Sequence, residues 1–218
     1  MTDKHRRFLG PVVEMRKLHD SAEQRIVHSA EMLDRKSLAS VGDTTGERLT
    51  ALLTETKAHT PEELAANVAR IGELLGRFAL YVPARFTDDP AEQAKYWAVR
   101  SGIFPAVGGS RPAGTTCLIE DVAFHIEDLP RATAELQALI ARHGYDACIY
   151  GHALEDNYHF IINQSFSPPA EVARYEALMN DVAELVSAGT TARSKPSMAR
   201  GATWRPSSAA SRATTPWP

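Results

Sequence analysis

The stretch ACIYGHALEDNYHFIINQ, residues 147–164, contains two β-like runs, 147–153 and 158–163, with only four residues between them. Two strands joined by so short a connection pair as an antiparallel hairpin, because parallel neighbours need a crossover of a dozen or more residues. Three further runs, 52–57, 79–86 and 115–126, have a similar strand-like composition. The hairpin therefore predicts a sheet that is at least partly antiparallel.

Helical segments alternate with these runs. Residues 60–78 repeat apolar side chains at helical spacing behind a Thr-Pro start, and residues 129–143 and 170–186 do the same near prolines. This alternation predicts an α+β fold with ferredoxin-like layers, in which helices cover an antiparallel sheet. A doubly wound nucleotide fold is disfavoured, since no GxGxxG follows a strand and no P-loop is present.

The composition narrows the class of protein. With 218 residues, 44% of them hydrophobic, the chain can bury one sizeable core or two small ones, and a net charge of -3 with scattered Lys and Arg argues against nucleic acid as a partner. No apolar run approaches the roughly 20 residues of a membrane span, so we expect a cytoplasmic protein that reaches a membrane only through a partner. Cys117 and Cys148 are expected to be reduced core thiols.

Two histidines are the first candidates for chemistry. His152 ends one run of the hairpin and His159 begins the next, so both imidazoles come to one end of it. Imidazole binds Zn and similar divalent metals, and two such rings supply two corners of a site that needs a third protein ligand. On spacing alone, such a pair is more often two surface or core histidines than a metal site.

The segment GHALEDNYHF, residues 151–160, resembles the GHxxxGNxHF signature of the C-terminal domain of FAD-linked D-lactate and D-2-hydroxyglutarate dehydrogenases. Residues 85–129 resemble the same family in an aromatic-x-x-Arg helix, a Phe-Pro pair and an E-D-V-A-F strand. AEMLDRKSLASV, residues 30–41, resembles the opening of the family's substrate domain. The likeness implies a substrate or cap domain over residues 30–186, after a poorly matched segment 1–29.

The resemblance also implies roles for matching residues. His152 and His159 would be two ligands of a divalent metal, expected to be Zn, that polarises the substrate hydroxyl. Asn157 would lie close to the flavin of FAD. Arg100 would bind the substrate carboxylate through its planar guanidinium, although without the resemblance it is an ordinary charge on a helix surface.

Asp156 departs from the signature, which usually has Gly at this position. If the position needs a positive φ, Asp tolerates it better than most residues, and its carboxylate could disturb or join the metal site. Otherwise Glu155 and Asp156 are expected to be solvated acids of the turn. His125, where the family usually has Pro, is expected to be a satisfied strand histidine and no ligand.

Two parts of the family's machinery have no counterpart in this sequence. The family's flavin lies mainly in a large N-terminal domain, whereas this chain begins shortly before the substrate domain. A motif of the form YDGSLxAEHGTGRNMAPF, which supplies a third metal ligand from Glu and the catalytic base from His, has no match after Val186. The resemblance therefore assigns no catalytic residue to this chain.

The end of the sequence carries a trace of that motif. Residues 187–218 are rich in Ser, Thr, Ala, Arg and Pro without any period, which predicts disorder. Yet one permitted choice of codons for residues 190–208, read from the third base of each codon, spells EAEHGTGRNMAPFV. We therefore expect that a frameshift near Ser187, real or from sequencing, replaced the motif with residues of another frame.

These observations predict a fragment of an FAD-dependent D-lactate-type dehydrogenase, which oxidises a D-2-hydroxyacid to a 2-oxoacid with hydride transfer to flavin. The partners implied are the small hydroxyacid and a separate flavin domain or subunit, while the electron acceptor and the oligomeric state stay open. Two alternatives also stay open. One is a non-catalytic α+β module that binds a metal through His152 and His159 or pairs with a flavin subunit, and the other is an inactive remnant of a decayed gene.

Overall fold

A computed structural model describes residues 3–20, 25–42 and 50–191 of the chain. Within these residues, five strands form one sheet in which all neighbouring strands are antiparallel. The order across the sheet is β2-β1-β4-β5-β3. The strands are β1 (Ser29–Leu33), β2 (Ala51–Glu55), β3 (Thr116–Ala123), β4 (Cys148–His152) and β5 (Asn157–Gln164). The predicted α+β class and antiparallel sheet are thus confirmed.

Six helices accompany the sheet in the described residues. Several begin with a side chain that satisfies a free backbone N–H of the first turn, as Asp34 does by accepting from the Ser37 N–H and Thr60 by accepting from the Glu63 N–H. The helices are α1 (Asp3–His19), α2 (Arg35–Ser40), α3 (Pro61–Leu75), α4 (Pro90–Gly109), α5 (Leu129–Arg142) and α6 (Pro169–Thr191).

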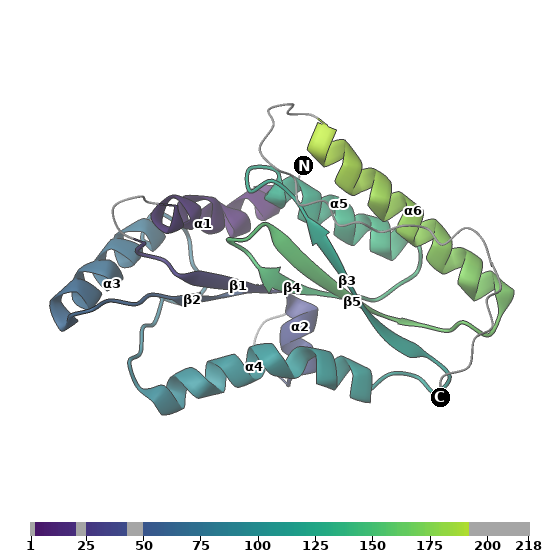
Figure 1. The fold of residues 1–218 in the computed structure, drawn as a ribbon, viewed down its shortest axis with the longest axis horizontal. Helices are drawn as coiled ribbons and strands as arrows, with labels where there is room; N and C mark the ends of the chain where they lie inside the picture. Colours follow the sequence, from purple (N-terminus) through teal and green to yellow (C-terminus); the bar gives the residue numbers. More distant parts are fainter. Residues whose placement is uncertain (1–2, 21–24, 43–49, 192–218) are drawn as a thin grey trace, which may run out of the picture.

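The helices lie on both faces of the sheet (Figure 1). Helices α1, α5 and α6 lie over one face, and α2 and α4 lie over the other. Since successive strand residues point to opposite faces, Tyr158, Phe160 and Ile162 of β5 join the first core while His159 and Ile161 face α2 and α4. The sheet therefore separates two clusters of buried side chains, one on each face.

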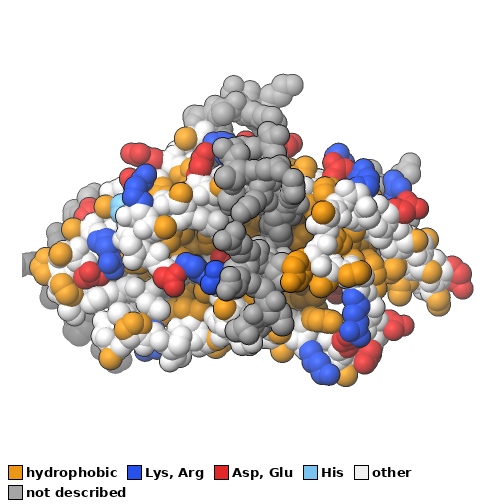
Figure 2. Space-filling view, turned by 180° about the vertical axis from the view of Figure 1, so that it is seen from behind, with side chains coloured by type: hydrophobic (Ala, Val, Ile, Leu, Met, Phe, Trp, Pro, Cys, Tyr) orange, Lys and Arg blue, Asp and Glu red, His pale blue; other side chains and the backbone are white. Residues whose placement is uncertain are grey.

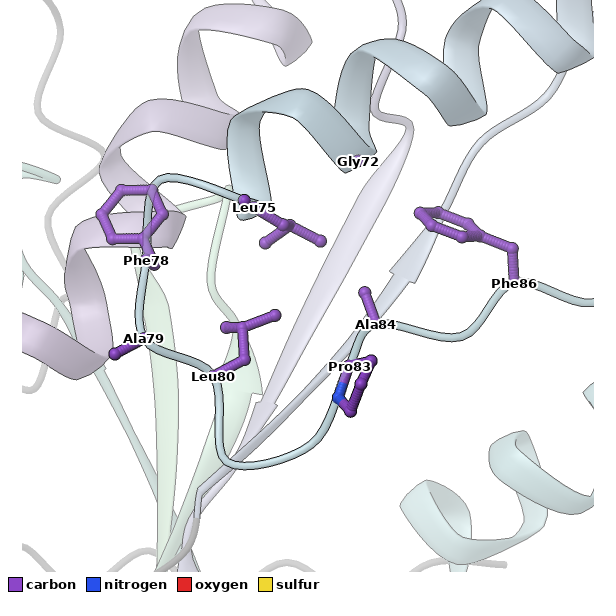
Figure 3. A pocket seen from close by; sticks show the side chains of 9 residues that line it. Gly72, Leu75, Phe78, Ala79, Leu80, Pro83, Ala84 and Phe86 are labelled. Carbon is purple, nitrogen blue, oxygen red and sulfur yellow. The ribbon is translucent and has the colours of Figure 1, made fainter.

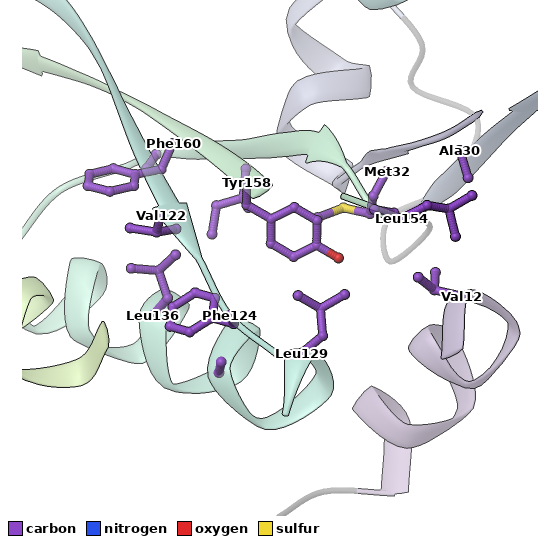
Figure 4. Close-up of a cluster of buried hydrophobic side chains, with 14 of the residues drawn as sticks. Val12, Ala30, Met32, Val122, Phe124, Leu129, Leu136, Leu154, Tyr158 and Phe160 are labelled. Atoms are coloured by element: carbon purple, nitrogen blue, oxygen red, sulfur yellow. The ribbon is translucent and has the colours of Figure 1, made fainter. Parts of the chain in front are cut away.

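The core under α1, α5 and α6 is large and apolar (Figure 4). Phe160, Leu136 and Leu129 are fully buried there, together with the ring of Tyr158. Residues from α1 complete the cluster, since Val12 and Met15 pack into it. This face is the main source of stability, because burial of large apolar side chains is the dominant favourable term in folding.

The core between the sheet and α2 and α4 is smaller. It contains Leu33, Ile103, Cys148, Tyr150 and Ile161. Several large apolar side chains of α4 and of the segment before it are exposed. Figure 2 shows hydrophobic side chains in recesses of one face of the molecule. The exposed ones include Leu80, Tyr81, Val82, Phe86, Tyr96, Trp97 and Phe104.

Some expectations are confirmed and others corrected. The predicted strand 79–86 is wrong, because the segment forms no strand, contains Pro83 and pairs with no other strand, and Tyr81 is 75% exposed. Both cysteines are free as expected, and burial raises the pKa of the Cys148 thiol to about 12.

The end of the last helix also differs from the prediction. Helix α6 continues to Thr191, past the expected end at Val186, so the first residues assigned to the disordered tail are helical. The remaining tail, 192–218, with its predicted disorder and frameshift, lies outside the described residues. No helix in the described ranges is long and apolar enough to span a membrane.

Candidate functional site

The β4–β5 hairpin brings the two predicted histidines together. His152 is the last residue of β4, His159 lies in β5, and their ring centroids are 5.4 Å apart at an interplanar angle of 84°. Gly151 makes this approach feasible, because its φ is +154° and a Cβ there would lie 2.6 Å from the carbonyl oxygen of Asn157. The glycine before His152 is therefore required by the backbone.

Glu31 links this pair to the rest of the site. It lies in β1, where it is the register partner of His152. Its side chain is only 5% exposed, with Oε1 2.5 Å from Nδ1 of His152 and Oε2 accepting a hydrogen bond of 3.0 Å from Nε of Arg100. One buried carboxylate thus joins two of the residues that the sequence had singled out.

Arg100 reaches the cluster from α4. Its guanidinium carbon lies 4.7 Å from the centroid of the Tyr150 ring, a cation–π distance, and its side chain is 19% exposed. The reading of Arg100 as an ordinary surface charge is therefore wrong. Among the described residues, the hydrogen bond from Nε to Glu31 is the only one that the guanidinium makes.

His159 has a carboxylate partner on β3, the strand on the opposite side of β5 from β4. Asp121 is its register partner on β3, and Oδ1 of Asp121 is hydrogen bonded to Nδ1 of His159. The imidazole itself is mostly buried, whereas the carboxylate is 61% exposed. Both histidines therefore have a carboxylate at Nδ1. The carboxylate beside His152, from Glu31, is buried, and the one beside His159, from Asp121, is exposed.

This pattern leaves Nε2 of both rings as the atoms that can bind a ligand. Metal-ligating histidines usually have their second nitrogen held by a carboxylate or a carbonyl, so the pair fits two corners of a metal site. The described residues contain no group of three His, Cys, Asp or Glu side chains that could hold an ion. The expectation of zinc is therefore not supported by a complete ligand set.

Asn157 lies beside the histidines. It is the register partner of His152 on β4 and, being two residues before His159, points to the same face of the sheet. Its side-chain oxygen is buried and has no hydrogen-bond partner among the described residues. A buried acceptor without a donor is costly, so the position suits a donor from a bound group.

Asp156 does not belong to the histidine cluster. Its φ is +62°, in the region where the sequence had suggested a glycine-like requirement. Its carboxylate binds Nη1 of Arg16 from α1 at 3.1 Å, and the same nitrogen donates to the carbonyl of Leu154 at 2.6 Å. Partial burial raises the pKa of Asp156, and Arg16 opposes that shift. The expectation of a solvated turn acid is therefore wrong for Asp156, and its carboxylate does not join the histidines.

A separate apolar hollow of about 500 Å³ lies at the end of α3 (Figure 3). It is lined by that helix and by the irregular segment that follows, which includes Leu80, Pro83 and Phe86. None of its lining residues belongs to the histidine cluster. The hollow and the cluster are therefore different features of the chain.

Sequence reasoning had not identified Glu31, Asp121 or Tyr150. Glu31 lies between two apolar residues of its strand, which is a signal that period-2 patterning can give, whereas Asp121 follows another acid, Glu120. Both acids face the same side of the sheet as the histidines. Which strand lies beside the hairpin is set by tertiary pairing, so the contact of Glu31 with His152 has no local signal. Tyr150 could have been found, since it is two residues before His152 in the same strand.

Comparisons with known proteins agree on the fold. The family model described as "FAD linked oxidases, C-terminal domain" matches residues 15–190. A solved structure of p-cresol methylhydroxylase with substrate bound has a TM-score of 0.56 at 12% identity, covering 84% of this chain and 41% of that one. A 4-ethylphenol oxidase from Gulosibacter chungangensis, in complex with isoeugenol, has a TM-score of 0.50 at 12% identity, covering 87% and 42%.

The coverage is one-sided. This chain spans about two fifths of the length of both solved chains, so it is similar to one part of each. At this identity the likeness concerns the fold alone. No protein in a search of curated sequences matches the chain.

Proposed function

The chain belongs to the FAD linked oxidases, as a C-terminal domain of that family, and from this premise we propose that it is the substrate side of a D-lactate-type dehydrogenase. Such an enzyme oxidises a D-2-hydroxyacid to the 2-oxoacid. The observation that carries the proposal is the convergence of Arg100, His152 and His159 at one place on the sheet, with Glu31 between Arg100 and His152.

Each of these groups suits one part of a 2-hydroxyacid. The terminal nitrogens of Arg100 form a planar fork that can pair with a carboxylate. The Nε2 atoms of His152 and His159 would hold a divalent metal, which when bound polarises the hydroxyl group as a Lewis acid. Asn157 would lie against FAD, which when bound accepts the hydride from the α-carbon.

The choice of a hydroxyacid over a phenol rests on charge. The two solved structures named above are a p-cresol methylhydroxylase and a 4-ethylphenol oxidase, whose named substrates carry no carboxylate. Arg100 is held in a mostly buried position, where its Nε donates to the Glu31 carboxylate. A second anion, such as a substrate carboxylate, complements that guanidinium better than a neutral phenol does.

A flavin domain or subunit is the proposed partner. Exposed apolar side chains on α4 and on the segment 80–86 include Trp97, Phe104, Tyr81 and Val82. Large contiguous apolar surface on a protein exterior often marks an interaction site. The same exposed apolar side chains would also fit the alternative, a non-catalytic module that pairs with a flavin subunit. That module would bind no hydroxyacid.

The proposal includes the loss of the family's last motif. The out-of-frame match in residues 190–208 supports a frameshift that removed the third metal ligand and the base. Loss of a general base alone typically lowers a rate by about 10²- to 10⁴-fold. We therefore expect the isolated chain to bind a hydroxyacid without turning it over.

Ligand titration followed by NMR tests the proposal. D-lactate should shift the side-chain signals of His152 and His159, and Arg100→Lys should weaken this binding by about 10-fold or more, since a bidentate pair is lost. Arg131→Lys is the matched control, because Arg131 lies in an exposed i,i+4 pair on α5 and should leave binding unchanged. Shifts caused by 4-ethylphenol and none by D-lactate would contradict the hydroxyacid.

Sequencing of the gene tests the tail. A single-base shift near the codon for Ser187 that restores the EAEHGTGRNMAPFV frame would make the chain a misread part of a working dehydrogenase. Confirmation of the present frame would favour the inactive remnant. In both cases, the binding experiment reports separately on Arg100 and the histidines.

A further inference from the structure

Glu31 is the most buried charged side chain of the cluster, and its two oxygens serve two different groups. Oε1 contacts Nδ1 of His152 at 2.5 Å and Oε2 accepts from Nε of Arg100 at 3.0 Å. The side chains of these two partners come from two elements, His152 from β4 and Arg100 from α4. A single carboxylate therefore couples the position of the imidazole to that of the guanidinium.

The chemistry of the three groups fixes where the protons are. An ionised carboxylate can only accept hydrogen bonds, and the guanidinium of Arg100 can only donate. The Nδ1 atom of His152 must then carry a proton that it donates to Glu31. In a neutral ring this leaves Nε2 without a proton, so its lone pair is available to a metal or to a donor on the substrate.

We propose that Glu31 is a positioning residue that holds His152 in the Nδ1–H tautomer and orients Arg100 through the hydrogen bond to its Nε. The inference rests on the proposed function for what these groups bind, and on geometry alone for the tautomer. Glu31 itself touches no ligand through its two occupied oxygens. It acts through His152 and Arg100.

Asp121 gives a comparison within the same site. Its hydrogen bond to Nδ1 of His159 is the counterpart of the Glu31 contact, but Asp121 is 61% exposed while Glu31 is 5% exposed. Water competes for an exposed carboxylate and weakens its hold on a partner. Glu31 should therefore control the tautomer of His152 more strictly than Asp121 controls that of His159.

The substitution Glu31→Gln separates these roles at nearly constant size. The amide has one acceptor oxygen and one donor nitrogen, whereas both partners of Glu31 are donors. The oxygen should turn to Arg100, which cannot lose its proton, and the amide NH₂ then faces Nδ1 of His152. His152 can accept this hydrogen bond only if its proton moves to Nε2.

Nitrogen NMR of the histidine rings, recorded on the full chain near pH 9 where imidazoles are neutral, reports the tautomer directly. Wild type should show His152 as Nδ1–H, and Glu31→Gln should convert most of it to Nε2–H while His159 is unchanged. Asp121→Asn should change His159 alone, and to a smaller extent. Glu135→Gln, on the exposed face of α5, is the control that should change neither ring.

Zn²⁺ titration of the same variants adds a second readout. If wild type binds Zn²⁺ through the two rings, Glu31→Gln should weaken binding by about 10- to 100-fold, as loss of such support does elsewhere. Absence of Zn²⁺ binding in wild type would count against the metal in the proposed function and leave the tautomer result intact. An unchanged His152 tautomer in a folded Glu31→Gln protein would overturn the role of Glu31.

If Glu31→Gln does not fold, Glu31→Asp keeps the charge with a shorter reach. Asp can serve one partner at a time, so we expect a mixture of the two His152 tautomers in a folded protein. A single, wild-type tautomer in Glu31→Asp, together with wild-type binding of D-lactate, would show that the shared carboxylate is not needed.

Discussion

The same strands contribute apolar side chains to one face of the sheet and polar side chains to the other. Beneath α1, α5 and α6, alternate residues of β5 such as Tyr158 and Phe160 are completely buried among apolar side chains. On the face toward α4, the residue between them, His159, stands beside His152, which in turn contacts Glu31. The first face supplies stability, and it allows the second face to bury charged groups at some cost.

This difference predicts that substitutions on the two faces can be separated by what they change. Changes beneath α1, α5 and α6 should lower the free energy of unfolding and leave the geometry of the histidines intact. Changes around β4 and Glu31 should alter that geometry with smaller losses of stability. The following predictions run from the largest expected effect to the smallest.

Phe160→Ala should have the largest effect on stability. Removal of a fully buried phenylalanine typically lowers the free energy of unfolding by about 3 to 5 kcal/mol, because transfer and cavity costs add. Urea unfolding measures the loss, and Phe86→Ala, at a 40% exposed position, is the control with a much smaller expected change. A similar loss in both variants would contradict the core beneath α1, α5 and α6 as the main source of stability.

Gly151→Ala tests the backbone of the hairpin. The new Cβ would meet the carbonyl of Asn157 at 2.6 Å, in a backbone conformation that side chains rarely adopt. Strain of this kind costs about 1 to 3 kcal/mol and should displace the His152 ring from His159. Thermal unfolding and ring contacts measured by NMR would reveal both changes. Gly109→Ala, with nothing within 4 Å of its Cβ, should change neither.

Asp34→Asn should change how stability depends on pH. Burial raises the pKa of Asp34, against the opposing hydrogen bonds from Ser37, so the folded state binds this proton more tightly than the unfolded state. Stability from this group is then highest below the unfolded pKa of 3.8 and falls as pH rises through the raised folded pKa, by at most about 1.4 kcal/mol per pH unit.

The amide of Asn has no such titration and keeps an acceptor for the Ser37 N–H, so α2 should retain its cap. Urea unfolding at several pH values above 4 would compare the two proteins. Equal slopes against pH would show that Asp34 does not contribute. Glu135→Gln, which removes one negative charge from an exposed position on α5, is the control for a general charge effect.

Asp156→Gly should have the smallest effect. Glycine relieves the positive φ of 62°, while the loss of the carboxylate removes the ion pair with Arg16. Each of these terms is about 0 to 1 kcal/mol and they have opposite signs, so the net change should be below about 1 kcal/mol. Asp156→Ala loses the ion pair without relieving the φ and should be the less stable of the two in thermal unfolding.

The parts of the fold that could be predicted are those with local signals. The hairpin, α5 and α6 follow from a short connection and from helical periods, and the hairpin alone placed His152 next to His159. The strand expected at 79–86 failed because composition cannot show whether a neighbouring strand exists to pair with it. The segment instead leaves Tyr81 and Val82 exposed.

The part of the site that could not be predicted depends on contacts between distant parts of the chain. Arg100 was singled out through a resemblance, but its burial over Tyr150 follows from how α4 packs on the sheet. The contact of Glu31 with His152 had no local signal, because the two residues lie on strands that are far apart in the sequence. Helical and strand periods describe neighbours in the chain and say nothing of such pairs.

The position of β1 in the sheet also has a consequence for how the protein folds. Glu31 and His152 are 121 residues apart, so β1 can pair with β4 only after most of the chain has been synthesised and a long loop has been closed. Non-local pairing of this kind is slow to form, whereas the β4–β5 hairpin is local and fast. The bond between Glu31 and His152 should therefore be among the last contacts made.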